Sequence, residues 1–138
     1  EGYSPSDTEK ISFQSEADGY RLPLEIEWEW AARGGGADNG FIYSGSNDLS
    51  KICWSRQSIW VVGESQCNEL GIHDMCGHVW QWCWDDIRPR GGDEATRATR
   101  GGSYSDPASS CTVAFRCSHK PNYIHANVGF RVARNRDV

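Results

Sequence analysis

The residues best suited to chemistry lie in the last third of the chain, between the blocks Arg100-Gly101-Gly102-Ser103 and Val128-Gly129-Phe130-Arg131-Val132. The run between these blocks is rich in Tyr, Ser, Asn, Asp and His. Such side chains supply adaptable hydrogen bonds and large contact areas at low entropic cost, as they do in antibody loops. The composition therefore indicates a binding surface held between fixed supports, and recognition rather than catalysis.

We name residues 104 to 127, approximately, the display segment. Its candidate ligand-binding side chains are expected to be mostly exposed and to cluster on one face, although the alternation around Phe115 is also compatible with an inward position. The candidates are Tyr104, Ser105, Asp106, Ser109, Ser110, Phe115, Ser118, His119, Tyr123, Ile124 and His125. The residues expected to support them from beneath are Gly102, Val113, Phe130 and Val132.

The cysteines and histidines do not form a metal-ligand pattern. The chain has six Cys but no CxxC motif, and no Cys and His share a zinc-ligand spacing. His119 and His125 lack a third partner, so we interpret them as contact residues. Cys83 lies among tryptophans and is typical of a buried thiol. We expect mostly thiols rather than disulfides, no catalytic residue, no metal and no cofactor.

Composition narrows the class of protein. At 138 residues the chain is long enough for one core, so residues 1–138 are expected to form a single domain. A net charge of −5 argues against a nucleic acid as the main partner, because phosphate binding needs a basic surface. No apolar run approaches the roughly 20 residues of a membrane span. Seven Trp and 15 Gly favour a fold rich in loops and braced by large side chains.

Hydrophobic periodicity predicts one helix and a few short strands. Residues 24–33 show helical spacing, with carboxylates in the first turn and Gly34-Gly35-Gly36 as the stop. Alternation of period two predicts strands at 79–84, 113–118 and 128–133, with shorter candidates at Ile52–Trp54 and Ile59–Val62. A turn is expected at Asn68–Gly71, and loops at 35–50 and 85–98. Trp80, Trp82 and Trp84 share one strand face, which we assign to core packing rather than to a sugar platform.

Several motifs in one order resemble the formylglycine-generating-enzyme (sulfatase-modifying factor) family. The motifs are Tyr20-Arg21-Leu22-Pro23, Glu27–Gly34, Asn68–Met75, Gly77–Trp82, Arg100–Ser103 and Gly129-Phe130-Arg131. The resemblance runs from about Tyr20 to Arg134. It implies an α+β, C-type-lectin-like fold with much irregular backbone. Members usually carry a further segment ahead of the Arg-Leu-Pro motif, so part of the family domain is expected to be missing here.

The resemblance also implies two metal sites, and this sequence departs from both. The enzymes hold copper with two cysteines; by position the second is Cys111, but the first is Asp106, a hard ligand ill suited to Cu(I). The calcium site of the family draws on a Gly-Asn-Val-Trp-Glu-Trp segment, in which the Asn is His78 here and the Glu is Gln81. Because calcium prefers oxygen ligands, we expect neither metal to be bound. Cys111 is expected to be a buried structural residue.

Another branch of the same family fits these departures. In the variable proteins of diversity-generating retroelements, Asn codons of a template are randomised at their adenines. This process cannot yield Glu, Gln, Lys, Met or Trp. From Tyr104 to Asn127 only Lys120 lies outside the permitted set.

The favoured hypothesis is therefore a non-enzymatic variable protein that binds a protein or other macromolecular ligand. Two alternatives stay open: a formylglycine-generating oxidase acting on a substrate cysteine, and a lectin-like glycan-binding module, although the calcium-lectin tripeptides Glu-Pro-Asn and Gln-Pro-Asp are absent. The sequence leaves the ligand and the cell address open. A surface or secreted location is favoured for a binder.

Overall fold

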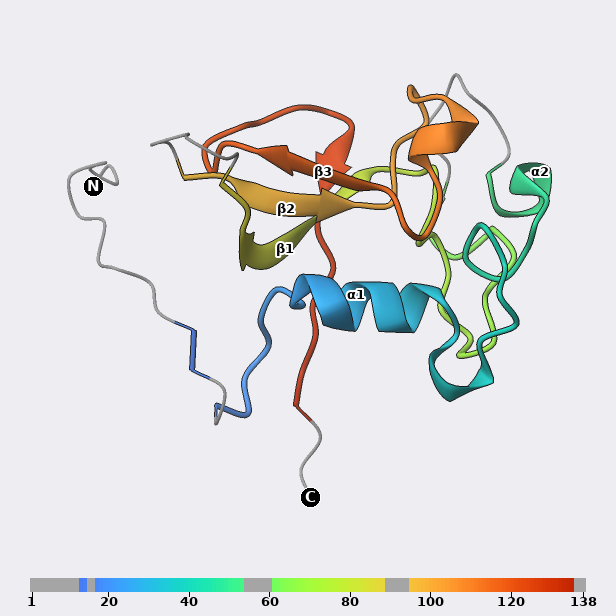
Figure 1. The fold of residues 1–138 in the computed structure, drawn as a ribbon, viewed down its shortest axis with the longest axis horizontal. Helices are drawn as coiled ribbons and strands as arrows, with labels where there is room; N and C mark the ends of the chain where they lie inside the picture. The colour runs from blue at the N-terminus through green and yellow to red at the C-terminus, as the bar shows by residue number, and fades with distance from the viewer. Residues whose placement is uncertain (1–12, 15–16, 54–60, 89–94, 136–138) are drawn as a thin grey trace.

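The computed structural model describes residues 13–14, 17–53, 61–88 and 95–135. Its helical elements are α1 (Glu25–Ala32), η1 (Gly35–Ala37), α2 (Leu49–Ile52) and η2 (Ala108–Ser110). Its strands, β1 (Trp80–Asp86), β2 (Arg97–Arg100), β3 (Arg116–His119) and β4 (Val128–Gly129), form one sheet in the order β3-β2-β1-β4. Helix α1 lies along one side of this sheet, the loop that follows β3 lies on the other side, and the last residues of the chain run back past α1 (Figure 1).

Helix α1 forms where the sequence predicts it. The backbone N–H of Leu24 donates to Glu27 Oε2 at 2.8 Å, and that of Glu25 donates to Asp85 Oδ2 at 2.5 Å, so carboxylates satisfy N–H groups at the helix start. At the other end Gly34 adopts φ 89°, a left-handed conformation that a glycine reaches without strain. Among the described residues, no helix is long and apolar enough to cross a membrane.

The strand register divides the sheet into two chemically different faces. Gln81 pairs with Arg100, which pairs with Arg116, and this row faces α1. There the indole N–H of Trp28 donates to Gln81 Oε1 at 2.8 Å. The buried apolar cluster on this inner side comprises Trp28, Ala32, Ile52, Met75, Cys76, Cys83, Ala98 and Val113.

A buried guanidinium joins α1 to the sheet. Arg100 is 1% exposed and donates to Glu25 Oε1 at 2.7 Å, to Glu29 Oε2 at 2.6 Å and to the carbonyl of Val113 at 2.6 Å. Arg116 binds the second oxygen of Glu25 at 2.5 Å. Burial alone would raise the pKa of Glu25 and of Glu29. The pKa of Glu25 is nevertheless lowered by Arg116 and Arg100, and that of Glu29 by Arg100 and Arg33, which hydrogen-bond and attract the carboxylates.

The tryptophans of β1 share a face as predicted, but it is not the face that packs on α1. Trp80 and Trp82 both contact His119, whereas Gln81 and Cys83 point to the inner core. The assignment to core packing is confirmed for Trp80, which is 5% exposed, whereas Trp82 and Trp84 are only half-buried, and none of the three belongs to the cluster around Trp28. The period-two alternation along β1 was correctly identified. Polar Gln81 points toward α1 because the Trp28 indole and the Asp74 carbonyl satisfy its side-chain amide there.

The other strands differ from the prediction. Strand β2 occupies part of the expected loop 85–98, because its residues Ala98, Thr99 and Arg100 are buried despite their polar sequence. Strand β3 begins only at Arg116, since Val113 lies in a turn and donates its N–H to Ile42 at 3.0 Å. The strand expected at Ile52–Trp54 is wrong at Ile52, which ends α2. Asp48 Oδ1 starts α2 by accepting from the Ser50 N–H.

Two further expectations have different outcomes. The turn at Asn68–Gly71 is confirmed by a 2.9 Å bond from the Gly71 N–H to the Asn68 carbonyl. Of the candidate strand Ile59–Val62, residues 59 and 60 lie outside the described residues, as does Trp54, while Val61 and Val62 are exposed and are not in a strand.

Phe130 and Val132 are not core residues, contrary to the prediction. They are 69% and 55% exposed. Strand β4 runs parallel to β1 for only two residues, and the chain then leaves the sheet to form a bridge between Ala133 and Arg21. The apolar alternation at 128–133 predicted a strand with Phe130 and Val132 facing inward, but the strand ends at Gly129. Gly102 and Val113, the other expected supports, are buried.

Replacing Glu25 with Gln tests the buried ion cluster. The ordinary pKa of Glu25 is 4.5 and its folded value is lower, so its contribution to stability is present above about pH 4.5 and disappears as pH falls through the folded pKa. We expect Glu25→Gln to lower the free energy of unfolding at pH 7 by about 3–5 kcal/mol, because it leaves buried Arg100 short of charge. Urea unfolding between pH 7 and pH 3 measures both quantities. The exposed control Glu64→Gln should match the parent, and an equal loss in the two variants would contradict the prediction.

Candidate functional site

The outer face of the sheet carries a continuous series of aromatic rings. Trp80 and Trp82 lie 6.3 and 5.9 Å from His119 between ring centroids. His119 stacks on Tyr123 at 4.5 Å, and Tyr123 is nearly parallel to His125 at 6.1 Å. The series thus runs from the buried sheet to the solvent, and its outer members belong to the display segment.

His119 is the junction between sheet and loop. Its Nδ1 lies 3.0 Å from the hydroxyl of Thr99 on β2, in a pair whose donor depends on the tautomer. Burial lowers the pKa of His119 below its ordinary 6.5, although Asp106 acts in the opposite direction. The ring is therefore neutral at pH 7 and can pack among its aromatic neighbours without a buried charge.

Asp106 is a structural acceptor at the base of the display segment. Its Oδ2 accepts from the indole N–H of Trp80 at 2.9 Å, from the backbone N–H of Ser103 at 3.0 Å and from the Ser103 hydroxyl. These donors fix the first turn of the segment onto β1. A carboxylate oxygen with three protein donors is a poor candidate for a ligand contact or a metal ligand.

Asn127 ties the two ends of the display segment together. Its side-chain amide donates to the hydroxyls of Ser103 and Ser105 at 3.2 and 3.1 Å. Its backbone carbonyl accepts from the backbone N–H of Trp80 at 2.8 Å. His125 contacts the Asn127 side-chain oxygen. The segment therefore begins and ends over the same tryptophan.

The eleven predicted contact residues divide into two groups. Six are exposed, namely Ser105, Ser109, Phe115, Tyr123, Ile124 and His125. Five are half-buried, namely Tyr104, Asp106, Ser110, Ser118 and His119. The structure brings Phe115, His119, Tyr123 and His125 into one aromatic group around Trp80 and Trp82. Ile124, at 93% exposed, projects furthest into solvent.

The residues at the implied copper position do not fit that metal. Cys111 is 1% exposed, and its sulfur lies 3.6 and 3.8 Å from the carbonyls of Pro107 and Ser103. Where the enzymes have their other cysteine, Asp106 offers a hard carboxylate that already accepts hydrogen bonds. The pair lacks the two soft ligands that Cu(I) requires.

The residues at the implied calcium position do not fit a cation either. Gln81 Oε1 accepts from the Trp28 indole at 2.8 Å and from Arg131 Nε at 2.5 Å. Arg131 also binds the carbonyls of His73 and Asp74 at 3.0 and 3.3 Å. A guanidinium thus occupies the oxygen atoms that a calcium ion would need.

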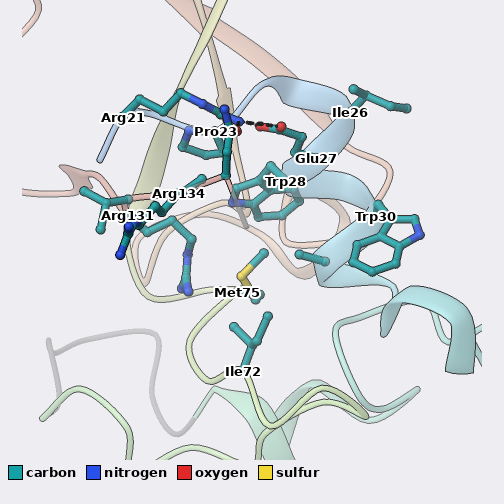
Figure 2. A pocket seen from close by; sticks show the side chains of 14 residues that line it. Arg21, Pro23, Ile26, Glu27, Trp28, Trp30, Ile72, Met75, Arg131 and Arg134 are labelled. Carbon is teal, nitrogen blue, oxygen red and sulfur yellow. Dashed lines mark hydrogen bonds and ion pairs between the residues drawn. The ribbon is translucent and has the colours of Figure 1, made fainter. Parts of the chain in front are cut away.

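A cleft of about 690 Å³ lies beside α1, away from the display segment. Trp28, Met75 and Ile72 line its wall, while Arg21 bonds Glu27 at its rim (Figure 2). Ile26 and Trp30 are 73% and 58% exposed at its edge. The cleft is apolar and is not continuous with the aromatic series on the outer face of the sheet.

The comparisons with known proteins identify the family. The sulfatase-modifying factor enzyme 1-like domain matches residues 5–136, and the chain belongs to this family. It is 34% identical to a formylglycine-generating enzyme of Streptomyces coelicolor, over 87% of this chain and 48% of the enzyme. It is 30% identical to the chaperone protein LppX of Paenibacillus barcinonensis, over 91% and 53%, and 31% identical to the mouse inactive C-alpha-formylglycine-generating enzyme 2, over 83% and 43%.

Solved structures define the fold. Treponema denticola variable protein 1 superposes with a TM-score of 0.76 at 31% identity, over 86% of this chain and 49% of that one. CarF superposes with a TM-score of 0.80 at 31% identity, over 90% and 50%. The chain thus has the α+β, C-type-lectin-like fold of the formylglycine-generating-enzyme type, as predicted. It spans about half the length of the relatives it matches.

Sequence reasoning missed the fixed parts of this site. Trp80, Trp82, Thr99 and Asn127 position the display segment, yet none was proposed for that role. The alternation of the tryptophans was a usable signal, because a second aromatic face on a strand needs a cover. Thr99 and Asn127 carry no local signal, since their partners are distant in sequence.

Asp106 and Ile124 should respond differently to truncation. Asp106→Ala removes the acceptor of three donors, so we expect the free energy of unfolding to fall by about 1–3 kcal/mol. Ile124→Ala should change it by less than about 0.5 kcal/mol, because the side chain is almost fully exposed. Urea unfolding of the two variants measures this. If Ile124→Ala is as destabilising as Asp106→Ala, the outer loop is not a free surface.

Proposed function

We propose that this chain is a non-enzymatic ligand-binding protein of the retroelement variable type, with residues of about 104–127 as its recognition surface. Its ligand is a protein or another macromolecule. Residues 1–138 act as one domain that supports this surface.

The observation that carries the proposal is a division of labour within the display segment. The Asp106 carboxylate accepts hydrogen bonds from the Trp80 indole and from Ser103, and the Ser103 hydroxyl accepts one from Asn127. These bonds fix the base of the segment without any ligand. Of the exposed side chains, Ser105 and His125 contact Asn127, whereas those of Tyr123 and Ile124 lie outside that hydrogen-bond network. Such positions can change without loss of core energy, whereas changes in a packed core cost about 2–5 kcal/mol.

The similarity to Treponema denticola variable protein 1 supports this proposal. The exposed candidates all belong to the set of residues that randomised Asn codons can yield. Trp80 and Trp82, which lie outside that set, form the floor instead. Aromatic groups flanked by hydroxyl and imidazole groups suit a protein ligand, because they offer contact area together with adaptable hydrogen bonds.

An oxidase of the formylglycine-generating type is the second candidate, because 34% identity links the chain to such an enzyme. Against it stand the carboxylate at Asp106 and the burial of Cys111. The similarity to an inactive formylglycine-generating enzyme 2 indicates that this fold also occurs without the activity.

Resequencing of the gene within one lineage of its host tests the variable-protein proposal. We expect substitutions at the codons of the exposed display positions, at the sites where a constant, near-identical repeat nearby carries adenines. The codons for Trp80, Trp82 and Lys120 serve as internal controls and should stay constant, because adenine randomisation of Asn codons yields neither residue. Invariant display codons, or substitutions spread evenly over the gene, would argue against this function.

A copper assay separates the second candidate. The reduced chain, titrated with Cu(I) and offered a cysteine-containing peptide, should consume no oxygen above background, because only one of the two thiolates is present. The Streptomyces coelicolor enzyme, measured in parallel, is the positive control. Stoichiometric Cu(I) binding with conversion of the peptide would establish the oxidase and overturn the non-enzymatic assignment.

A further inference from the structure

Three of the six cysteines gather around one backbone turn, below the display segment. Cys76 and Cys111 are each 1% exposed, and Cys53, at the C-terminal end of α2, is half-buried. The thiol of Cys53 donates to the carbonyl of Gly77 at 3.4 Å. The chain elements that carry these thiols are far apart in sequence, so the cluster is a product of the fold.

Two of these sulfurs lie beside the same glycine, Gly77. A Cβ placed on Gly77 would lie 2.9 Å from the sulfur of Cys53 and 3.7 Å from that of Cys111. Gly77 has φ 73°, and a side chain there would overlap the Cys53 sulfur, so this arrangement requires glycine. Both sulfurs therefore lie close to one point of the backbone.

We propose that Cys53 and Cys111 are a thiol pair that forms a disulfide by exchange with a small-molecule disulfide. The structure holds both residues as thiols, which is the reduced state of the pair. Cys53 is the residue that a small disulfide reaches first, because it is the more exposed. Cys111, a buried residue within the display segment, is the resolving residue.

The exchange proceeds in two balanced steps. The Cys53 thiolate attacks one sulfur of the small disulfide, which forms a mixed disulfide and releases one small thiolate. The Cys111 thiolate then attacks the Cys53 sulfur, forms the Cys53–Cys111 bond and releases the second small thiolate. The two cysteines lose two electrons together, the small disulfide gains them, and the two cysteine protons end on the two released thiols.

Three of the other cysteines, Cys76, Cys83 and Cys117, are less suited to this exchange. Cys76 accepts a hydrogen bond from the Ser44 N–H at 3.4 Å, and burial raises the pKa of its thiol to about 12, so it is hardly ionised at neutral pH. The same cause raises the pKa of Cys83 to about 12. Cys117 lies on β3, and its sulfur contacts the Ser118 carbonyl rather than this cluster.

The bond would connect the ligand surface to a distant element. Cys111 directly follows η2, and its sulfur contacts the carbonyls of Ser103 and Pro107 at the start of the display segment. A link from Cys111 to Cys53 anchors this start to α2. The inference does not depend on the proposed function, because it concerns the redox state of the fold and not the ligand.

Peptide mapping of the oxidised chain tests the pair. The reduced chain is incubated with oxidised glutathione at pH 8, alkylated and digested with trypsin without reduction. Cleavage after Lys51, Arg56, Arg100 and Arg116 places Cys53 and Cys111 each in a peptide with no other cysteine. Mass spectrometry should then find these two peptides joined, and a thiol assay in denaturant should show the loss of two of the six thiols.

Four variants make the result decisive. Cys53→Ser and Cys111→Ser should each abolish the joined peptides, whereas the matched controls Cys67→Ser and Cys117→Ser should retain them. The mapping of the parent chain does not depend on whether Cys111→Ser folds. A glutathione adduct that stays on Cys53, a joined peptide that contains Cys76, or the retention of six thiols would each overturn the proposal.

Discussion

The structure depends on a single buried guanidinium between helix and sheet. Arg100 donates hydrogen bonds to two carboxylates of α1, those of Glu25 and Glu29, and to the carbonyl of Val113. Because a buried charge is tolerated only when it is paired and hydrogen-bonded, these contacts fix the angle and height of α1 over β2. They also fix the turn at Val113, and through it the position at which β3 begins. Small domains with little regular structure need such a joint, since short elements bury little area on their own.

Because the Arg100 cluster holds α1 on one face of the sheet, the opposite face can carry the display segment. The period of two along β1 sends Gln81 and Cys83 toward α1, and sends Trp80 and Trp82 outward. Of the display segment, Val113 is the residue that belongs to the buried cluster on the inner side. The outer tryptophans form a floor whose cover is the display segment itself. The inner core and the proposed recognition surface thus use alternate residues of the same strand.

The sequence allowed α1, β1 and the fold family to be predicted, because each depends on local periodicity or on several motifs in order. Strand β2 was missed because residues 85–98 are charged and contain glycine, which suggests a solvated loop, and only a distant carboxylate pair makes burial of Arg100 possible. The opposite error occurred at Phe130 and Val132, where an apolar alternation has no strand to orient it. Tyr123 and Ile124 were placed at the surface by the turn-forming residues before them, and they are exposed. The contacts of Asp106 and Asn127 required the folded chain, since their partners are set by tertiary structure.

The hydrogen bonds from the Asn127 amide to Ser103 and Ser105 have a geometric meaning beyond the support of one loop. They close the display segment into a ring, and both of its ends are attached at β1. The positions of these attachments do not depend on the residues between them. The entropy of closing such a ring grows only with the logarithm of its length, by about 0.6 kcal/mol for each doubling. Residues inserted at its outer arc, near Ile124, would therefore enlarge the ring at little cost, and the sheet below would keep the same two points of attachment. The size of this surface, as well as its chemistry, is thus left open by the fold.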